Sequence, residues 1–168
     1  MTKETYEKMT ELLRSDEKLT KLLGVLNKVL TYIIFAAYPA MLVYLFISKR
    51  ELLLRAVIVP AASFAILSVF RRAVNFPRPY EVFGMPPVIP KNTKGKSFPS
   101  RHVFSVAIIG MVALYAFEAP IIGMIILIIA VLMAVLSVFS GVHFPRDVIA
   151  GFICGVLMGA ALFIMRNS

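Results

Sequence analysis

Two histidines and an aspartate in this sequence have the types and spacing of a nucleophilic site. His143 and Asp147 lie one helical turn apart, so the carboxylate can hold one imidazole N–H and leave the other ring nitrogen free. His102 is the only other histidine of the chain, and an imidazole can donate a proton to a leaving group near neutral pH. The three residues predict nucleophilic catalysis assisted by a separate general acid.

Arginine and serine residues near the histidines predict that the group under attack is a phosphoryl group. Arg71 and Arg78 carry guanidinium forks, which match phosphate oxygens and stabilise the charge of a phosphoryl transition state. Ser100 is expected at the N-terminus of a helix, where free N–H groups and the helix dipole favour an anion. With the two imidazoles, these residues predict phosphoryl transfer that needs no metal ion and no other cofactor.

The composition places this chemistry in a membrane. Of the 168 residues, 60% are hydrophobic and 16% are charged, against roughly 45–50% and about 25% in soluble globular proteins. These values exclude a disordered chain and almost any soluble enzyme, and the single cysteine excludes a disulfide scaffold. The net charge is +9, but the basic residues lie between long apolar runs. This pattern favours contact with lipid headgroups or phosphates over nucleic-acid binding.

The apolar runs predict an all-α, polytopic bundle of about five transmembrane helices. A helix needs about 20 mostly apolar residues to cross a bilayer, and four runs meet this requirement. The run at 103–117 is shorter, but it lies between two qualifying runs, and its first turn is expected to extend back to Ser100. The predicted spans are residues 29–48, 52–70, 103–117, 119–142 and 148–165.

The N-terminal segment is predicted to be an amphipathic helix over residues 2–23. Its apolar and charged side chains fall on opposite arcs at helical spacing, with Asp16 as an intruder on the apolar arc. Such a helix lies at the membrane surface, and a solvated helix docked on the bundle remains an equal alternative. We therefore divide the chain into this helix, residues 1–23, and a transmembrane domain, residues 24–168.

The order of the spans predicts that the polar clusters meet on one membrane face. Consecutive spans alternate in direction, so the second span ends, the third begins, the fourth ends and the fifth begins on the same side. The clusters at 71–78, 100–102 and 143–147 all fall at these places. The long connection between residues 71 and 101 contains six prolines, which forbid a continuous helix there.

Each polar residue also has a structural interpretation when it is taken alone. A single histidine at a helix end is usually only hydrogen-bonded, and Asp147 could complement a helix dipole. Arg71 and Arg72 could anchor a span at the headgroups. We interpret a further set of basic residues as headgroup or solvent contacts, namely Lys91, Lys94, Lys96 and Arg146. The coincidence of three clusters on one side favours function for the first group.

The chain contains three short motifs, and in all three, and in their order, it resembles the type 2 phosphatidic acid phosphatases. The first reads Arg71, six residues, then Arg78-Pro79, with arginine in place of the family's first lysine. The second, at 99–102, reads Pro-Ser-Arg-His where the family has Pro-Ser-Gly-His. The third places His143 four residues before Asp147. The resemblance covers residues 52–165. The family that it indicates consists of membrane lipid phosphatases related to vanadium haloperoxidases.

The resemblance implies a role for each matching residue. His143 would attack phosphorus and form a phosphohistidine, with Asp147 orienting the ring. His102 would protonate the leaving oxygen and then activate water. Arg71, Arg78 and Ser100 would cradle the phosphoryl group, and no metal ion would take part.

Two departures from the family's motifs change the charges available to a bound phosphate. Ser137 stands where the third motif has a phosphate-binding arginine, and Arg101 replaces the glycine of the second motif. We hypothesise that Arg101 supplies the missing charge. Without such compensation, the loss of one phosphate donor could cost about 3–4 kcal/mol of transition-state stabilisation. Family members usually have six spans, and here the amphipathic helix stands in place of the first.

The sequence therefore predicts an integral membrane phosphatase that acts on a phosphomonoester or pyrophosphate of a lipid. Candidate substrates are undecaprenyl diphosphate, phosphatidylglycerol phosphate and phosphatidic acid. The alternative is a catalytically weak or inactive lipid-phosphate binding protein; a small transporter is less favoured, because the spans have few polar positions at their centres. We expect membrane lipids as partners and no nucleic acid, and the sequence assigns no oligomeric state.

The sequence gives two opposing indications of membrane orientation. Most lysines and arginines lie on the face that carries the site, which would make that face cytoplasmic by the positive-inside rule. Several of them are motif residues, however, and the short opposite loop carries Lys49, Arg50 and Arg55. The family also has its site outside. We therefore expect a multi-pass protein of the cell membrane with its active site at the extracytoplasmic face.

Overall fold

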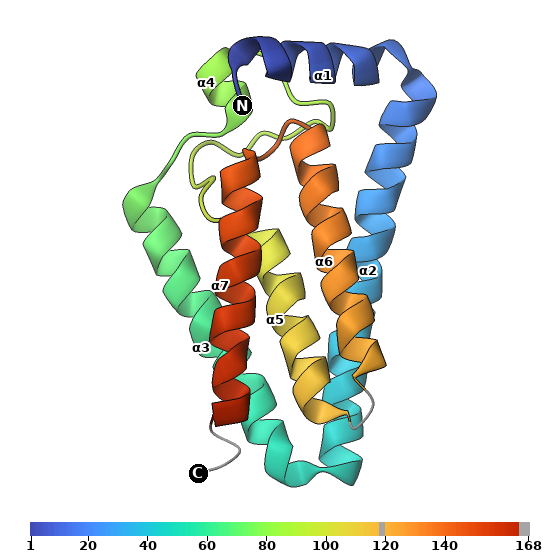
Figure 1. The fold of residues 1–168 in the computed structure, drawn as a ribbon, viewed down its shortest axis with the longest axis vertical. Coiled ribbons are helices and arrows are strands. Elements are labelled where there is room, and N and C mark those ends of the chain that lie inside the picture. The colour runs from blue at the N-terminus through green and yellow to red at the C-terminus, as the bar shows by residue number, and fades with distance from the viewer. Residues whose placement is uncertain (118–119, 165–168) are drawn as a thin grey trace.

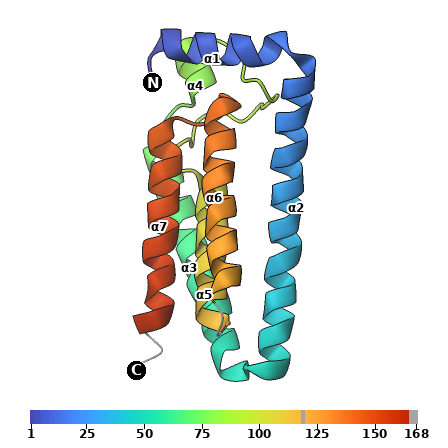
Figure 2. The same cartoon turned by 45° about the vertical axis from the view of Figure 1, so that its right-hand side comes forward.

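The computed structural model describes residues 1–117 and 120–164, and these residues form seven helices and no strand. Figures 1 and 2 show an upright bundle with the first helix lying across one end of it. The helices are α1 (Lys3–Ser15), α2 (Glu17–Ser48), α3 (Arg50–Val74), α4 (Pro79–Phe83), α5 (Arg101–Ala116), α6 (Ile121–Phe139) and α7 (Pro145–Ile164).

Helices α2, α3, α6 and α7 lie in the four stretches that are long and apolar enough to cross a membrane. Their outward faces carry large apolar side chains that would be unfavourable in water, such as Phe35 and Ile47 of α2, each 72% exposed. Val69 of α3, Ile128 of α6 and Leu157 of α7 are exposed in the same way. Exposed apolar faces of this size are expected in contact with lipid chains.

Helix α5 is the short fifth apolar helix, and it is the central element of the bundle. It begins at Arg101 with Ser100 as its N-cap residue, as the sequence predicted for this span. Most of its residues are buried, and it packs mainly against α6 and α7. Because neighbouring helices cover it, α5 does not need the full length of a lipid-facing span. In Figure 1 it begins below the ends of α6 and α7.

Three glycines of α7 bring this helix close to α5. Gly151, Gly155 and Gly159 recur at intervals of four residues and so lie on one helix face. A Cβ atom on Gly151 would come within 2.5 Å of the Ser100 carbonyl oxygen, which leaves no room for any side chain there. The close approach allows the Ser100 N–H to donate a 2.7 Å hydrogen bond to the carbonyl of Asp147. The packing thereby joins the second and third motifs.

The N-terminal helix ends earlier than the sequence predicted. Helix α1 stops at Ser15, and residues 17–23 form the first turns of α2 rather than the end of a surface helix. Asp16 causes the break, because its carboxylate caps α2 by accepting hydrogen bonds from the N–H groups of Lys18 and Leu19. This role explains the acidic residue on the apolar arc.

Helix α1 is docked on the end of the bundle that carries the polar motifs. Its Tyr6 side chain is fully buried, and the hydroxyl lies 3.3 Å from the carbonyl oxygens of both Met85 and Gly141. Thr10, one turn later, is also buried. Gly141 has a φ of +72°, and a Cβ there would lie 2.7 Å from the Tyr6 hydroxyl oxygen. α1 thus packs directly on the turn that precedes His143.

The proline-rich connection between α3 and α5 is folded back over the same end of the bundle. It contains only the single short helix α4 within the described residues. Glu81 of α4 secures it, because its carboxylate accepts hydrogen bonds from the Gly95 N–H (3.0 and 2.9 Å) and the Arg78 N–H (2.8 Å). Further along, the Val88 N–H donates to the Ser140 carbonyl at the end of α6.

Candidate active site

Both histidines line one small cavity at the end of the bundle beneath α1. We call this space, of about 190 Å³, the histidine cavity. His102 reaches it from the first turn of α5, and His143 from the turn between α6 and α7. Its lining residues are Asn27, Ile89, Pro90, Lys91, His102, Ser137, Ser140, Val142 and His143. The odd–even order of the spans therefore brings together two imidazoles that are distant in sequence.

His143 is held with its Nε2 atom toward a guanidinium. The residue is only 5% exposed, and Nη1 of Arg78 lies 3.3 Å from Nε2. A guanidinium can only donate hydrogen bonds, so Nε2 must offer its lone pair and the ring proton must sit on Nδ1. In this tautomer, Nε2 is the atom able to act as a nucleophile.

The Nδ1 side of His143 faces a serine and a carboxylate. Nδ1 lies 3.4 Å from the Ser97 hydroxyl oxygen and 3.6 Å from Oδ2 of Asp147, the second separation being slightly longer than a hydrogen bond. The Ser97 hydroxyl donates a 2.5 Å hydrogen bond to the same carboxylate oxygen. Ser97 and Asp147 are both fully buried, so they fix the ring within a rigid polar cluster. No sequence signal pointed to Ser97, because it lies outside the three motifs.

Burial keeps His143 neutral. Removal of the ring from water is the main reason that its pKa is lowered from 6.5 to about 4, and the nearby carboxylate of Asp147 opposes this shift only in part. The positive charge of Arg78 acts in the same direction as burial. At neutral pH the imidazole therefore has its lone pair available, as a nucleophile requires.

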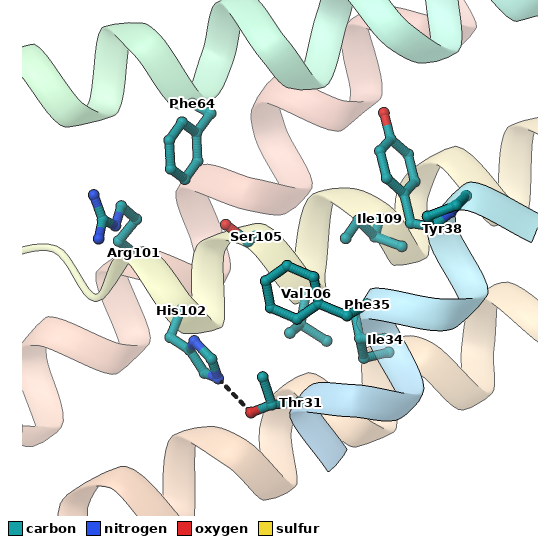
Figure 3. A pocket seen from close by; sticks show the side chains of 11 residues that line it. Thr31, Ile34, Phe35, Tyr38, Phe64, Arg101, His102, Ser105, Val106 and Ile109 are labelled. Carbon is teal, nitrogen blue, oxygen red and sulfur yellow. Dashed lines mark hydrogen bonds between the residues drawn. The ribbon is translucent and has the colours of Figure 1, made fainter. Parts of the chain in front are cut away.

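His102 is oriented by a residue of α2. Its Nε2 atom lies 2.9 Å from the Thr31 hydroxyl oxygen, as the dashed line in Figure 3 shows. The single hydroxyl proton of Thr31 is donated to the carbonyl of Asn27, at 2.6 Å. Thr31 must therefore accept from His102, which places a proton on Nε2 of that ring. Neither Thr31 nor Asn27 stood out in the sequence, because both lie far from the motifs, Thr31 within the first apolar run and Asn27 just before it.

Arginines surround a second space, of about 270 Å³, which we call the arginine cavity. Arg78 is buried and also donates to the carbonyls of Gly95 and Val142. Arg101 places its guanidinium over the ring of Phe64, 5.4 Å from the centroid. The residues that line the arginine cavity are Ser68, Arg71, Arg72, Arg78, Lys91, Thr93, Lys96 and Arg101.

Arg71 has a structural role in addition to lining this cavity. The side chain is buried and donates to the backbone carbonyls of three loop residues, Lys96, Ser97 and Pro99. These bonds hold the segment of the loop that carries Ser97 and leads into α5. Its donors are thus largely engaged with the backbone, whereas Arg78 has a donor directed at Nε2 of His143.

The hydroxyl of Ser100 is a further group that could bind a ligand. Ser100 is fully buried, and its hydroxyl makes no hydrogen bond within the described part of the chain. A buried hydroxyl without a partner is unfavourable, so it is available to a ligand oxygen.

Among residues 1–117 and 120–164, no three His, Cys, Asp or Glu side chains lie close enough together to hold a metal ion.

An apolar groove begins at the two residues that open α5. It has a volume of about 610 Å³ and lies between α2, α3 and α5, with Arg101 and His102 at its polar end (Figure 3). Aromatic and aliphatic side chains form most of its wall, including Phe35, Tyr38 and Phe64. His102 lines both this groove and the histidine cavity, so the two spaces adjoin at its ring.

A profile of the PAP2 superfamily matches residues 52–168. The chain belongs to the PAP2 superfamily. The match covers α3 to α7 and all three motifs, in agreement with the range that the sequence resemblance predicted. Thr31, which binds His102, lies outside the matched range. No protein in the curated collection of sequences matches the chain.

Two solved structures share the PAP2 fold over nearly the whole chain. LpxE of Aquifex aeolicus has a TM-score of 0.73 at 22% identity, covering 96% of this chain and 93% of LpxE. A transmembrane PAP2-type phosphatidylglycerolphosphate phosphatase from Bacillus subtilis has a TM-score of 0.71 at 18% identity, covering 98% of this chain and 85% of that enzyme. With the apolar helices, these findings establish a multi-pass membrane protein and support a phosphatase.

Proposed function

We propose that this PAP2 protein is a lipid phosphatase that works through a phosphohistidine at His143. The observation that carries the proposal is the pair of imidazoles on one cavity, with the Nε2 lone pair of His143 directed at the Arg78 guanidinium. An anionic phosphoryl group entering there would draw the guanidinium to its oxygens and leave Nε2 free to attack. Ser100 and Arg101 would bind further oxygens, and Arg71 would hold the loop around them.

In the first step, the Nε2 lone pair of His143 attacks phosphorus and the bond to the lipid oxygen breaks. His102, which the entering phosphate dianion favours in its imidazolium form, passes one ring proton to the departing oxygen, so the lipid product leaves as an alcohol or, from a pyrophosphate, as a monophosphate. The Nδ1 proton of His143 faces Ser97 and Asp147, which stabilise the positive ring as the P–N bond forms.

In the second step, water displaces His143 from phosphorus. His102, now neutral, accepts a proton from the attacking water as the P–N bond breaks, and inorganic phosphate leaves. His102 returns to the imidazolium and His143 to its neutral form. His102 supplies the proton in the first step and recovers it in the second, and His143 carries the phosphoryl group between them, so the proposed cycle requires no metal ion.

The apolar groove supports a lipid as the substrate. An apolar chain lying between α2, α3 and α5 would place a headgroup at Arg101 and His102, where the groove adjoins the histidine cavity. The substrate would be a phosphomonoester or pyrophosphate of a lipid, as in undecaprenyl diphosphate, phosphatidylglycerol phosphate or phosphatidic acid. The phosphatidylglycerolphosphate phosphatase among the structural neighbours makes the second of these the first to assay.

We place the active site at the extracytoplasmic face. Lys49, Arg50 and Arg55 lie at the opposite end of the bundle, where short basic loops mark the cytoplasmic side. A Cys154→Ser, Lys94→Cys double variant tests this in intact cells. A membrane-impermeant maleimide should label the new cysteine without permeabilisation, whereas labelling only after permeabilisation would reverse the assignment.

The activity test uses the purified full chain and a panel of lipid phosphates in the presence of EDTA. We expect phosphate release that chelation does not reduce and that His143→Ala abolishes. The alternative function, a lipid-phosphate binding protein, is favoured by one observation, the serine at position 137. Binding of the same lipids without phosphate release from any of them would establish that alternative.

A further inference from the structure

The residue that replaces the family's third-motif arginine leaves the histidine cavity without a charge from α6. Ser137 lines this cavity beside both histidines, but its hydroxyl donates to the carbonyl of Met133 within its own helix. Its carbonyl accepts from the N–H groups of Val142 and His143 and so shapes the turn. Ser137 therefore positions the nucleophile's backbone and contributes no cation to a bound phosphate.

Arg101 is not placed to supply that cation at the same point. Its guanidinium lies over Phe64 of α3 and lines the apolar groove and the arginine cavity. Among the described residues, those that line the histidine cavity do not include Arg101. The charge that the sequence gains at position 101 thus lines the apolar groove and the arginine cavity, and not the cavity that Ser137 lines.

Lys91 is the cation that the histidine cavity does contain. The loop that carries it is fixed to the end of α6, because the Val88 N–H donates a 3.0 Å hydrogen bond to the Ser140 carbonyl. Val88 is 5% exposed, so this attachment is buried and firm. Lys91 lies three residues after Val88, and Ser137 lies three residues before Ser140, so this hydrogen bond holds the two residues near each other.

Lys91 also joins the two polar cavities. It lines the histidine cavity with Ser137 and the arginine cavity with Arg78, and it is the residue that the two linings share. Arg71, Arg78 and Arg101 line the arginine cavity with Lys91, and partial desolvation together with their positive charges lowers the pKa of Lys91. Its side chain is exposed and makes no hydrogen bond or ion pair with other described residues.

We propose that Lys91 replaces the third-motif arginine as a phosphate-binding cation, reaching from the α4–α5 loop the position that an arginine at 137 would reach from α6. The proposal rests on the proposed phosphatase function and assigns one of its ligand-binding residues. The cations that line these adjoining cavities repel one another, and an entering phosphoryl dianion relieves this repulsion. A lysine ammonium on a flexible stem can follow the phosphate as a point charge through both steps.

The test combines removal of the charge with its return from the other element. Lys91→Met keeps the length of the side chain and removes the ammonium; we expect kcat/KM for the best lipid phosphate to fall about 100-fold, as for one lost transition-state donor. Lys94→Met, an exposed lysine of the same loop, is the matched control and should stay within twofold. When Lys91→Met is combined with Ser137→Arg, kcat/KM should be at least tenfold higher than in Lys91→Met alone.

Inhibition by orthovanadate gives a second readout. Vanadate resembles the five-coordinate phosphoryl transition state, so its inhibition constant should rise at least tenfold in Lys91→Met and remain unchanged in Lys94→Met. Lys91→Met with unchanged kcat/KM and vanadate inhibition would overturn the assignment of Lys91 alone. Failure of the wild-type chain to hydrolyse any lipid phosphate would instead overturn the proposed function, and direct vanadate binding by the same variants would still decide for or against Lys91.

Discussion

The Nε2–H of His102 donates a 2.9 Å hydrogen bond to the hydroxyl oxygen of Thr31, linking the first turn of α5 to the middle of α2. The donor direction follows from the second bond of Thr31, whose proton goes to Asn27. The candidate acid is therefore held by a helix that lies outside the part of the chain matched by the superfamily. This relationship leads to the first prediction.

Thr31→Val should lower kcat about fivefold and leave KM unchanged. The substitution keeps the shape of the side chain and removes the acceptor, and a hydrogen bond of this kind contributes about 1 kcal/mol. Thr31→Ser keeps the hydroxyl and should restore kcat, which a purely structural effect of the lost methyl group would not allow. Equal kcat in the valine and serine variants would show that Thr31 does not position His102.

Acid should destabilise the protein through His143. In the unfolded chain this imidazole has a pKa near 6.5, while in the folded chain burial lowers the pKa to about 4. Between these values the unfolded state binds the proton more strongly, so the free energy of unfolding falls as the pH drops from 6.5 to 4 and levels off below 4. The lost stability amounts to at most about 3 kcal/mol.

The measurement is the thermal midpoint of the detergent-solubilised protein across this pH range, compared with His143→Gln. The glutamine variant has no titrating ring, so its midpoint should depend less steeply on pH. Parallel curves for the two proteins would mean that other groups cause the acid sensitivity.

The sequence predicted the order of the helices and the meeting of the motifs well, because long apolar runs and alternating direction are strong constraints. His102 and His143 could be assigned to one membrane face from parity alone. The sequence could not assign Thr31, Ser97 or Lys91 to the site. Each lies outside the motifs, and only the packing of segments that are distant in sequence brings it there.

The N-terminal boundary shows the same limit on a smaller scale. The apolar arc continues past Asp16, and periodicity alone favours one helix to residue 23. The structure instead uses the Asp16 carboxylate as the N-cap of α2 and turns the chain there. Local hydrogen bonding by a short acidic side chain outweighs the amphipathic pattern, and a capping residue followed by charged helix formers is the signal that could have located the break.

Close packing of α5 on α7 should be essential to the site. Gly151→Ala would place a methyl group 2.5 Å from the Ser100 carbonyl oxygen, which must move. We expect a loss of stability of about 1–3 kcal/mol and a fall in kcat, because Ser100 and the Asp147 backbone would separate. Gly24→Ala is the matched control: a Cβ on this α2 glycine has nothing within 4 Å. It should stabilise the helix by about 0.5–1 kcal/mol, and destabilisation by both variants to the same degree would contradict the packing argument.

Glu81 should control the arginine cavity from a distance. Its carboxylate binds the N–H groups of Gly95 and Arg78, and the Gly95 carbonyl in turn accepts from Nε of Arg78. Glu81→Ala should free this part of the loop and lower kcat/KM about tenfold, mostly through weaker phosphate binding. Glu51→Ala, an exposed carboxylate at the opposite end of the bundle, should have no effect on steady-state kinetics with a soluble phosphomonoester or with lipid.

The most direct test of the account asks where the phosphoryl group goes. In His102→Asn the first step can proceed with p-nitrophenyl phosphate, whose leaving group needs no acid, while the second step lacks its base. Rapid quenching in alkali and peptide mass spectrometry should then find one phosphoryl group on His143 after a burst of p-nitrophenol. A burst of p-nitrophenol with His143 unmodified, or with the phosphoryl group on another residue, would contradict the central claim.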